Sequence, residues 1–311
     1  MNTKRVIDIS KWNVITDFSK VSADVDGVII RMGYRGNSTG GLIYDKEFVN
    51  NINGLSACDT PVGIYWFTNA INAYEGVEEA DFVIDTIKKM NLNLSFPVII
   101  DTEYGNDKHT GRADNIDNES RTDAVIAFLE RIMEAGYKSA IYASNSWFKD
   151  QLNYNRIKKY PKWVAKYSDT APTVRDNLIG WQKSSHGSCN GINGRVDIND
   201  WYISIGKESF LLSETPVQQE PPKVTTQTTN SAPTKEEQKE EKVISDGLQI
   251  TLKSASLYSN SSTSKVAATK SGTFYIWNKS IKNGRVRITT KESYVKQLGK
   301  VTGWINVSDI L

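Results

Sequence analysis

The stretch Phe96-Pro97-Val98-Ile99-Ile100-Asp101-Thr102-Glu103-Tyr104-Gly105 joins an apolar run to two carboxylates. The apolar part predicts a buried strand, and Asp101 and Glu103 stand two positions apart at its end. Because side chains alternate across a strand, both acids leave the same face, about 7 Å apart along the backbone. Two such acids repel each other and split their pKa values, giving one proton donor and one anion, as cleavage of a glycosidic bond requires. For this motif alone, a strand end whose acids simply face water is the alternative.

Composition limits the kinds of partner that this chain can have. Its 311 residues are 39% hydrophobic, which is enough for a substantial core and more than one average domain. The formal net charge of +2, without an arginine-rich stripe, predicts no nucleic-acid partner, and apolar runs too short to cross a bilayer predict no membrane partner. Cys58 and Cys189 are too few for a disulfide framework and lack metal-type spacing. We therefore expect two free thiols, no metal and no cofactor.

A change in composition divides the chain into two units. Residues 213–242 are rich in Pro, Thr, Gln, Glu and Lys and contain no aromatic residue, so this segment cannot bury a core. Its prolines favour an extended tether. We predict a catalytic domain over residues 1–206, a linker over residues 207–246, and a second domain over residues 247–311.

Eight short apolar runs recur in the first unit, and helical patterns separate the early ones. Strands that alternate with helices predict a parallel sheet, and eight strands in about 200 residues predict closure into an α/β barrel. After Tyr142 the gaps between runs shorten, so we expect a TIM-like (β/α)5(β)3 barrel whose last three strands have lost most of their helical cover. The runs are Val6–Ile9, Val28–Met32, Val62–Phe67, Val98–Ile100, Ala140–Tyr142, Trp163–Ala165, Leu178–Trp181 and Val196–Ile198.

The barrel gathers the acids at one end. Active sites of such barrels lie at the C-terminal ends of the strands, where Asp101 and Glu103 fall. Asp8 and Asp197 end the first and last runs, and those strands are neighbours in a closed barrel, so we expect four acids to converge. Aromatic side chains at strand ends offer flat faces for sugar rings, although each one taken singly is more often core. These candidates are Tyr65, Phe67, Trp163, Tyr167 and Trp181.

An ordered set of motifs resembles glycoside hydrolase family 25, the lysozymes found among phage endolysins and bacterial autolysins. The resemblance runs from about Arg5 to Tyr202. It implies cleavage of the β-1,4 bond between N-acetylmuramic acid and N-acetylglucosamine in peptidoglycan. The motifs are Val6-Ile-Asp8-Ile-Ser10, Ile29-Ile-Arg31-Met-Gly33-Tyr34, Pro61-Val-Gly-Ile-Tyr65-Trp-Phe67, Ile100-Asp101-Thr-Glu103, Trp163-Val-Ala-Lys-Tyr167, Trp181-Gln182 and Gly194-Arg-Val-Asp197-Ile-Asn199.

The resemblance also implies a role for each acid. Glu103 matches the general acid, which later serves as base for the incoming water. Asp101 matches its partner, which either stabilises an oxocarbenium ion directly or orients the substrate's own acetamido group; we favour the second. Asp8 and Asp197 are expected to hold hydroxyls, tune Glu103 and stabilise developing positive charge. Further substrate contacts are implied for Arg31, Tyr34 and Gln182.

The second unit contains an alternating hairpin around Asn283-Gly284, a strong signal for a two-residue turn. Residues 247–311 resemble a bacterial Src-homology-3 (SH3)-like wall-targeting domain. Such a small all-β barrel adds affinity through its tether and takes no part in the chemistry. The candidate wall contacts, about half of which we expect in the core, are Tyr258, Tyr275, Trp277, Arg285, Arg287 and Tyr294.

The biological setting follows from the resemblance and from the first residues. Residues 1–8 lead from two basic residues into a strand without the apolar region of a secretory signal. We therefore expect a phage endolysin of the clostridial type, held in the host cytoplasm without a signal peptide and released to the wall on lysis. Its partner would be peptidoglycan of a Gram-positive host; the sequence predicts no oligomeric state.

Three alternative functions remain open. A zinc amidase needs histidine-rich ligation, and the two histidines, His109 and His186, lack metal spacing. A Cys–His peptidase would need Cys58 or Cys189 beside a histidine, and Cys189 lies in a loop three residues after His186. A non-catalytic wall-binding protein would carry the acids as remnants, and the full acid set speaks against it.

Overall fold

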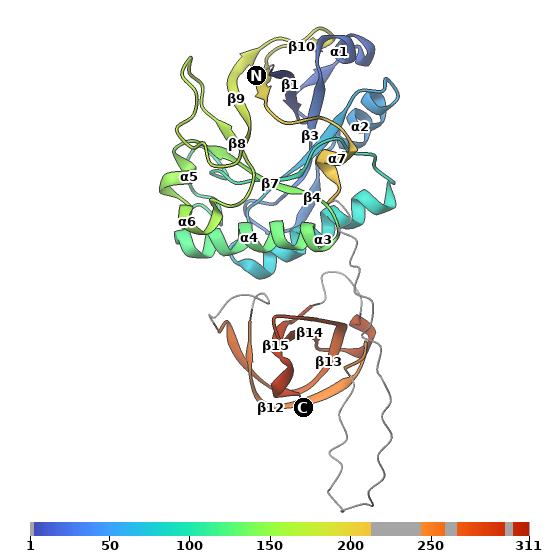
Figure 1. Cartoon of the computed structure of the whole chain (residues 1–311), viewed down its shortest axis with the longest axis vertical. Coiled ribbons are helices and arrows are strands. Elements are labelled where there is room, and N and C mark those ends of the chain that lie inside the picture. The colour runs from blue at the N-terminus through green and yellow to red at the C-terminus, as the bar shows by residue number, and fades with distance from the viewer. Residues whose placement is uncertain (1–2, 213–243, 259–265, 296–300, 311) are drawn as a thin grey trace, which may run out of the picture. The chain divides into compact units, whose positions relative to one another are not determined.

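Two separately folded units make up the described part of the chain (Figure 1). The structure is a computed structural model that describes residues 3–212, 244–258, 266–295 and 301–310. The first unit extends to Leu212, and the second holds the remaining described residues. Among these residues, no helix combines the length and the apolar character that crossing a bilayer takes.

A closed sheet forms the centre of the first unit (Figure 1). Strand β1 closes the ring, because it pairs in parallel with β3 and antiparallel with β11. The pairs from β3 to β9 are parallel, whereas β11 runs antiparallel to both of its neighbours. The predicted closed eight-stranded sheet is therefore confirmed, with one strand reversed. Its strands are β1 (Lys4–Ile9), β3 (Gly27–Arg35), β5 (Val62–Phe67), β6 (Val98–Asp101), β7 (Ser139–Ser144), β8 (Lys162–Ala165), β9 (Leu178–Gly187) and β11 (Val196–Trp201).

Short strands and helices surround this barrel. The edge strand β4 (Leu42–Tyr44) extends β3, and β2 (Val14–Ile15) pairs with β10 (Ile192–Asn193). In the described residues, no helix joins β8 to β9. Side-chain caps start the two long helices: Asn72 accepts from the backbone N–H of Glu75, and Asp117 from that of Ser120. The helices are α1 (Phe18–Asp24), α2 (Phe48–Ser56), α3 (Ala73–Lys89), α4 (Asn118–Glu134), α5 (Trp147–Asp150), α6 (Tyr154–Ile157) and α7 (Lys207–Phe210).

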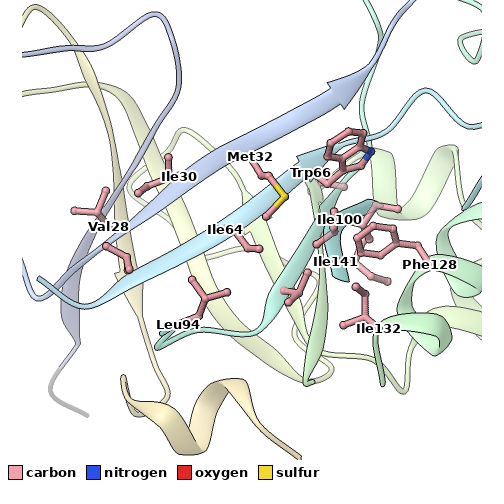
Figure 2. Packing of buried hydrophobic residues seen from close by; sticks show 14 of the residues in the cluster. Val28, Ile30, Met32, Ile64, Trp66, Leu94, Ile100, Phe128, Ile132 and Ile141 are labelled. Atoms are coloured by element: carbon pink, nitrogen blue, oxygen red, sulfur yellow. The ribbon is translucent and has the colours of Figure 1, made fainter. Parts of the chain in front are cut away.

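Strand alternation sorts the apolar side chains into two layers. Val28, Ile30 and Ile100 face the helices, and Figure 2 shows Phe128 and Ile132 of α4 pointing toward the strands in this layer. The intervening residues fill the barrel interior, with Phe96, Trp163 and Trp201 as its largest side chains. The rings of Phe96 and Trp201 lie 5.2 Å apart, and those of Trp163 and Trp201 lie 6.3 Å apart. These aromatic rings fill the lower part of the interior, at the N-terminal ends of the parallel strands. Polar side chains therefore occupy its upper end, at the C-terminal ends of those strands.

The first unit continues six residues beyond the predicted boundary at residue 206. Helix α7 packs against it, with Phe210 stacked on Tyr137 at 4.7 Å between ring centroids. The backbone N–H of Leu212 donates to the carbonyl oxygen of Gly136 at 3.0 Å. The predicted start of the linker at residue 207 is therefore wrong, because this segment is anchored by aromatic stacking and backbone hydrogen bonds. Residues 213–243 of the predicted linker lie outside the described residues.

The second unit is a small antiparallel sheet in the order β12-β13-β14-β15. Asn283 and Gly284, with φ of 48° and 71°, form the predicted turn between β13 and β14, so that hairpin is confirmed. An antiparallel bridge from Tyr258 to Trp304 joins the end of β12 to β15. Alternate residues build its core, which includes Ile276, Val286 and Ile305. The strands are β12 (Gln249–Leu257), β13 (Ala268–Lys282), β14 (Arg285–Thr289) and β15 (Gly303–Asn306), with short 3-10 helices at Glu292–Tyr294, between β14 and β15, and at Val307–Asp309, after β15.

Close approach of α3 and α4 makes Gly76 sensitive to substitution. A Cβ atom at Gly76 would lie 2.2 Å from the carbonyl oxygen of Ala124. We expect Gly76→Ala to lower the free energy of unfolding by about 1–3 kcal/mol, because the strain of separating two packed helices exceeds the gain in helix propensity. Chemical denaturation of both proteins measures this change. Gly41→Ala is the matched control, since its Cβ would meet only Thr39 Oγ1 at 3.8 Å; an equal loss in both variants would refute the explanation.

Candidate active site

Four carboxyl groups meet at the upper end of the barrel interior. Alternation along β1 and β6 turns Asp8 and Asp101 inward, and both are buried, with exposed fractions of 5% and 4%. Glu103 follows two residues after Asp101, just beyond the end of β6. Repulsion links Asp8 with Asp101, Asp101 with Glu103, and Glu103 with Asp197. The convergence of the four acids that the sequence predicts is present in the structure.

Asp197 reaches this cluster by a different route from the predicted one. It lies near the start of β11, so it does not end a parallel strand. Because β11 is antiparallel to β1, its N-terminal end lies at the same rim as the C-terminal end of β1, and Asp197 is directly opposite Asp8. The two carboxyls act on each other, and the pKa of each is raised, with burial as the first cause.

Burial dominates the electrostatics of the cluster. It raises the pKa of Asp8 well above the ordinary value, and the charge of Asp197 adds to this effect. The pKa of Asp101 is also raised well above the ordinary value by burial and then by Glu103, while Arg31 opposes the shift. Burial, followed by repulsion from Asp197, raises the pKa of Glu103 from 4.5 to about 7. Protein surrounds most of the Glu103 carboxyl. The side chain is nevertheless exposed to solvent, because it lines a groove.

Two amide side chains hold Asp8 in place. Gln182 Nε2 and Asn199 Nδ2 donate to Asp8 Oδ2 at 3.0 and 2.8 Å. Gln182 Oε1 accepts from the hydroxyls of Tyr142 and Tyr167 at 2.7 and 2.9 Å, which fixes the orientation of its amide. The hydrogen bonds from Asn199 and Gln182 lower the pKa of Asp8 and so oppose the effect of burial. Asn199 and Tyr142 are not among the predicted site residues, although alternation along β11 places Asn199 on the same face as Asp197.

Trp163 and Gln182, which the sequence predicts as substrate contacts, are both buried. Each has an exposed fraction of only 1%. Trp163 Nε1 donates to Asn199 Oδ1 at 2.7 Å, and Gln182 lies behind Asp8. The prediction is wrong for both residues because alternation gives the face of a strand but not the depth of a side chain below the rim.

The backbone on both sides of Glu103 is tightly held. Thr102 is buried, and its hydroxyl accepts from Trp147 Nε1 at 3.2 Å. The carboxylate of Asp114 accepts from the N–H groups of Gly105 and Gly111, both at 2.7 Å. No described group donates a hydrogen bond to the Glu103 carboxylate itself. The loop therefore fixes the main chain and leaves the acid side chain available to a ligand.

A groove of about 840 Å³ opens beside Glu103. One wall comes from the segment after β1 and from β3, with Lys11, Trp12, Arg31 and Tyr34. The other comes from the loops after β6 and β7, where His109 stacks on Tyr104 at 3.5 Å and Tyr104 meets Trp147 edge-on at 4.6 Å. Such aromatic faces suit sugar rings. Loops supply most of this lining, and a strand pattern carries no signal for loop residues. The groove residues that were therefore not predicted are Lys11, Trp12, Tyr104, His109 and Trp147.

The other predicted substrate residues lie around the acids and the groove. Arg31, Tyr34 and Phe67 line the groove, and Arg31 pairs with Asp45 at 2.6 Å. Tyr65 is half-buried, and its pKa is raised well above 10.0 by burial and then by the charges of Asp8, Asp101 and Glu103, while Arg31 lowers it. Tyr167 is 59% exposed beside the acids, and Trp181 is half-buried with its indole N–H on the carbonyl oxygen of Lys166.

The predicted wall contacts of the second unit fall into two groups. Trp277 and Arg287 are buried, and the Arg287 guanidinium lies 5.3 Å from the Trp277 ring and 4.7 Å from the Trp304 ring. Contact of these two residues with a wall polymer is therefore contradicted by their burial. The accessible candidates are Tyr258, Tyr275, Arg285 and Tyr294, all half-buried.

Both cysteines carry free thiols. Burial, followed by a hydrogen bond with Asp24, raises the pKa of the Cys189 thiol to about 12. A thiol with such a pKa is a poor nucleophile at neutral pH, which disfavours Cys189 as a peptidase nucleophile. Among the residues that the structure describes, no group of three or more His, Cys, Asp or Glu side chains has a geometry that would hold a metal ion.

A closed α/β barrel with a carboxyl cluster at its mouth is an arrangement that glycan-cleaving enzymes use. The family described as glycosyl hydrolases family 25 matches residues 7–192, more than half of the sequence. The chain belongs to this family.

The chain is also similar to individual proteins, which include a lysozyme, an endopeptidase and an autolysin. The chain is 26% identical over 197 residues to the autolytic lysozyme of Clostridium acetobutylicum, covering 63% of this chain and 55% of that enzyme. It is 33% identical over 92 residues to the D-alanyl-L-alanine endopeptidase of Streptococcus phage B30, covering 26% and 21%. The solved structure of the modular autolysin LytC from Streptococcus pneumoniae is 33% identical, with a TM-score of 0.57 over 65% of this chain and 47% of that one. The chain thus spans about half the length, or less, of these relatives.

The raised pKa of Glu103 predicts that ionisation of this carboxyl destabilises the fold. A folded-state pKa of about 7, against 4.5 ordinarily, means that stability present below pH 4.5 is lost as the pH rises through about 7. We expect Glu103→Gln to raise the free energy of unfolding by about 1 kcal/mol at about pH 8, after allowance for solvent screening, and to change it little at about pH 4. Urea unfolding at both pH values measures this. Asp169→Asn, in an exposed loop, is the charge-matched control; equal effects in both variants would contradict the assigned cause.

Proposed function

We propose that this protein is a lysozyme, which hydrolyses the β-1,4 bond between N-acetylmuramic acid and N-acetylglucosamine in bacterial peptidoglycan. The observation that carries the proposal is the gathering of four carboxyl groups with raised pKa values at the mouth of the barrel, next to an aromatic-lined groove. The 26% identity to an autolytic lysozyme, and the solved complex of the similar autolysin LytC with a synthetic peptidoglycan ligand, support it. We assign the first unit to the (β/α)5(β)3 variety of the barrel.

Glu103 supplies the proton in our mechanism. With a pKa of about 7 it is mostly protonated in mildly acidic solution and about half protonated at neutral pH, and it faces the groove. As the bond between C1 and the glycosidic oxygen breaks, Glu103 gives its proton to that oxygen. The resulting carboxylate then takes a proton from the water that attacks C1, which restores the enzyme.

Asp101 assists the same step from deeper in the barrel. Its Oδ1 atom has no hydrogen-bond partner among the described residues, and the positive charge of Arg31 opposes the rise of its pKa. In its ionised form it would orient the N–H of the substrate's acetamido group, whose carbonyl oxygen attacks C1. Alternatively, the same carboxylate would stabilise an oxocarbenium ion directly. Asp8 and Asp197 hold substrate hydroxyls, and the charge of Asp197 adds to burial in keeping the pKa of Glu103 high.

A glycosidase and a peptidase leave different products, so analysis of the products decides between them. We expect the wild-type protein to generate new reducing ends in purified walls, identified by mass spectrometry as N-acetylmuramic acid. Glu103→Gln should fold normally and lose activity about a thousandfold, and Asp101→Asn should be strongly impaired, because each removes one partner of the acid pair. New amino groups instead of reducing ends would support an amidase or peptidase, and wall binding without any cleavage would indicate a non-catalytic protein.

We further propose that the second unit is an SH3-like wall-binding domain and that the whole chain acts as a phage endolysin on Gram-positive walls. The four-stranded antiparallel sheet with a bridge between its first and last strands supports a small barrel. Half-buried Tyr258 and Arg285, whose guanidinium lies 3.4 Å from the Tyr258 ring centroid, form an accessible candidate surface. In this proposal the protein is held in the host cytoplasm and is released to the cell wall at lysis.

Truncation tests the division of labour between the units. A chain that ends at Leu212 keeps α7 and its contacts with Tyr137, so it should fold alone. We expect it to cleave soluble glycan fragments at the full-length rate and to bind whole walls at least about tenfold more weakly, because the second attachment point is lost. Sedimentation with insoluble walls measures binding. Undiminished binding by the shortened chain would remove the targeting role.

A further inference from the structure

Lys11 is a groove cation that has no carboxylate partner among the described residues. It lies in the turn between β1 and β2 and lines the groove together with Glu103. Its Nζ atom lies 4.6 Å from the Trp12 ring centroid and 5.7 Å from that of Tyr34. No ion pair joins Nζ to a carboxylate in the part of the chain that the structure describes. The other groove cation, Arg31, is already paired with Asp45 at 2.6 Å.

The position of Lys11 is built by contacts that do not use its ammonium group. The backbone N–H of Lys11 donates to Asp45 Oδ2 at 3.1 Å, the same oxygen that accepts from Arg31 Nε at 2.7 Å. A tight turn holds the segment, because the Asn13 N–H donates to the Ser10 carbonyl oxygen at 3.0 Å and Asn13 Oδ1 accepts from the Ser10 N–H at 2.9 Å. The buried carboxylate of Asp45 therefore fixes both cations of this wall while neutralising only one.

We propose that Lys11, with the rings of Trp12 and Tyr34, forms a subsite for a carboxylate carried on the muramic acid substituent of the substrate. This inference rests on the proposed lysozyme function. A substrate carboxylate is repelled by the acid cluster around Glu103, so it is most stable along the groove wall that carries an unpaired cation. The aromatic rings shield part of the ammonium from water, which strengthens an ion pair formed there.

The carboxylate has two chemical sources in peptidoglycan. It belongs either to the lactyl group, when no peptide is attached, or to the peptide stem, when the lactyl group is amidated by it. Three glycan preparations separate these sources: strands with intact stems, strands whose stems an amidase has removed, and stem-free strands whose lactyl carboxylates have been converted to methylamides. The full-length chain is used, and new reducing ends are measured against substrate concentration.

We expect Lys11→Met to lower kcat/KM about tenfold on a carboxylate-bearing strand, chiefly through KM, and Lys11→Arg to stay within about twofold of the wild type. On the methylamide strand the wild type and Lys11→Met should be equal, and about 0.5 M salt should shrink their difference on the charged strand. A loss on stem-free strands identifies the lactyl carboxylate, and a loss confined to stem-bearing strands identifies the stem. Lys88→Met, at the exposed end of α3, is the charge-matched control and should leave activity unchanged.

Two results would overturn the subsite. One is a Lys11→Met protein with wild-type rates on every strand; the other is an equal loss on the methylamide strand or in Lys88→Met, since neither depends on a substrate carboxylate at Lys11. Failure of the lysozyme proposal looks different, because the wild-type protein would then release no reducing ends from any preparation, and the subsite would fall with it.

Discussion

Closure of the sheet forces every second side chain of each strand into a narrow interior, and the rest of the first unit depends on this constraint. Phe96, Trp163 and Trp201 fill the lower part of that interior with aromatic rings. The carboxyls above them stand on an apolar floor, so burial is the first cause of each raised pKa, and mutual repulsion comes second or later. The same packing of aromatic rings therefore forms the core of the barrel and raises the pKa values of the carboxyls in the site.

Buried acids need partners, and the barrel supplies them from the same inward-facing positions. Asp8 has its two amide donors, Gln182 and Asn199, and each amide is oriented by an aromatic group, the hydroxyls of Tyr142 and Tyr167 for one and the indole of Trp163 for the other. No described group donates to Glu103 in this way, and its carboxyl keeps access to the groove. This difference matches a division between acids that are held as part of the structure and one that is left to exchange a proton with a ligand.

The sequence predicts strands and faces well, because both follow from a period of two. All eight apolar runs became strands of the closed sheet, and Asp8, Asp101 and Glu103 converge as expected. The two-residue period of a strand does not give its direction. The reversal of β11 was therefore not predicted, although Asp197 lies at the predicted place. The period also says nothing of depth, which is why Trp163 and Gln182 were assigned to substrate. Loop residues such as Lys11 and His109 have no period at all, and only the fold reveals that they line the groove.

The second unit shows the same limit of alternation more sharply. Val286 and Ile288 of β14 point into its core, so Arg285 and Arg287 share the opposite face of that strand. A pattern of arginines and aromatics on an outward face suggests a binding surface, yet Arg287 is covered by the rings of Trp277 and Trp304, whereas Arg285 lies against Tyr258 and stays half-buried. Arg285 and Arg287 lie on the same face of one strand, yet they differ in accessibility because different side chains lie next to them. Ligand contact by this unit should accordingly centre on the pair formed by Tyr258 and Arg285.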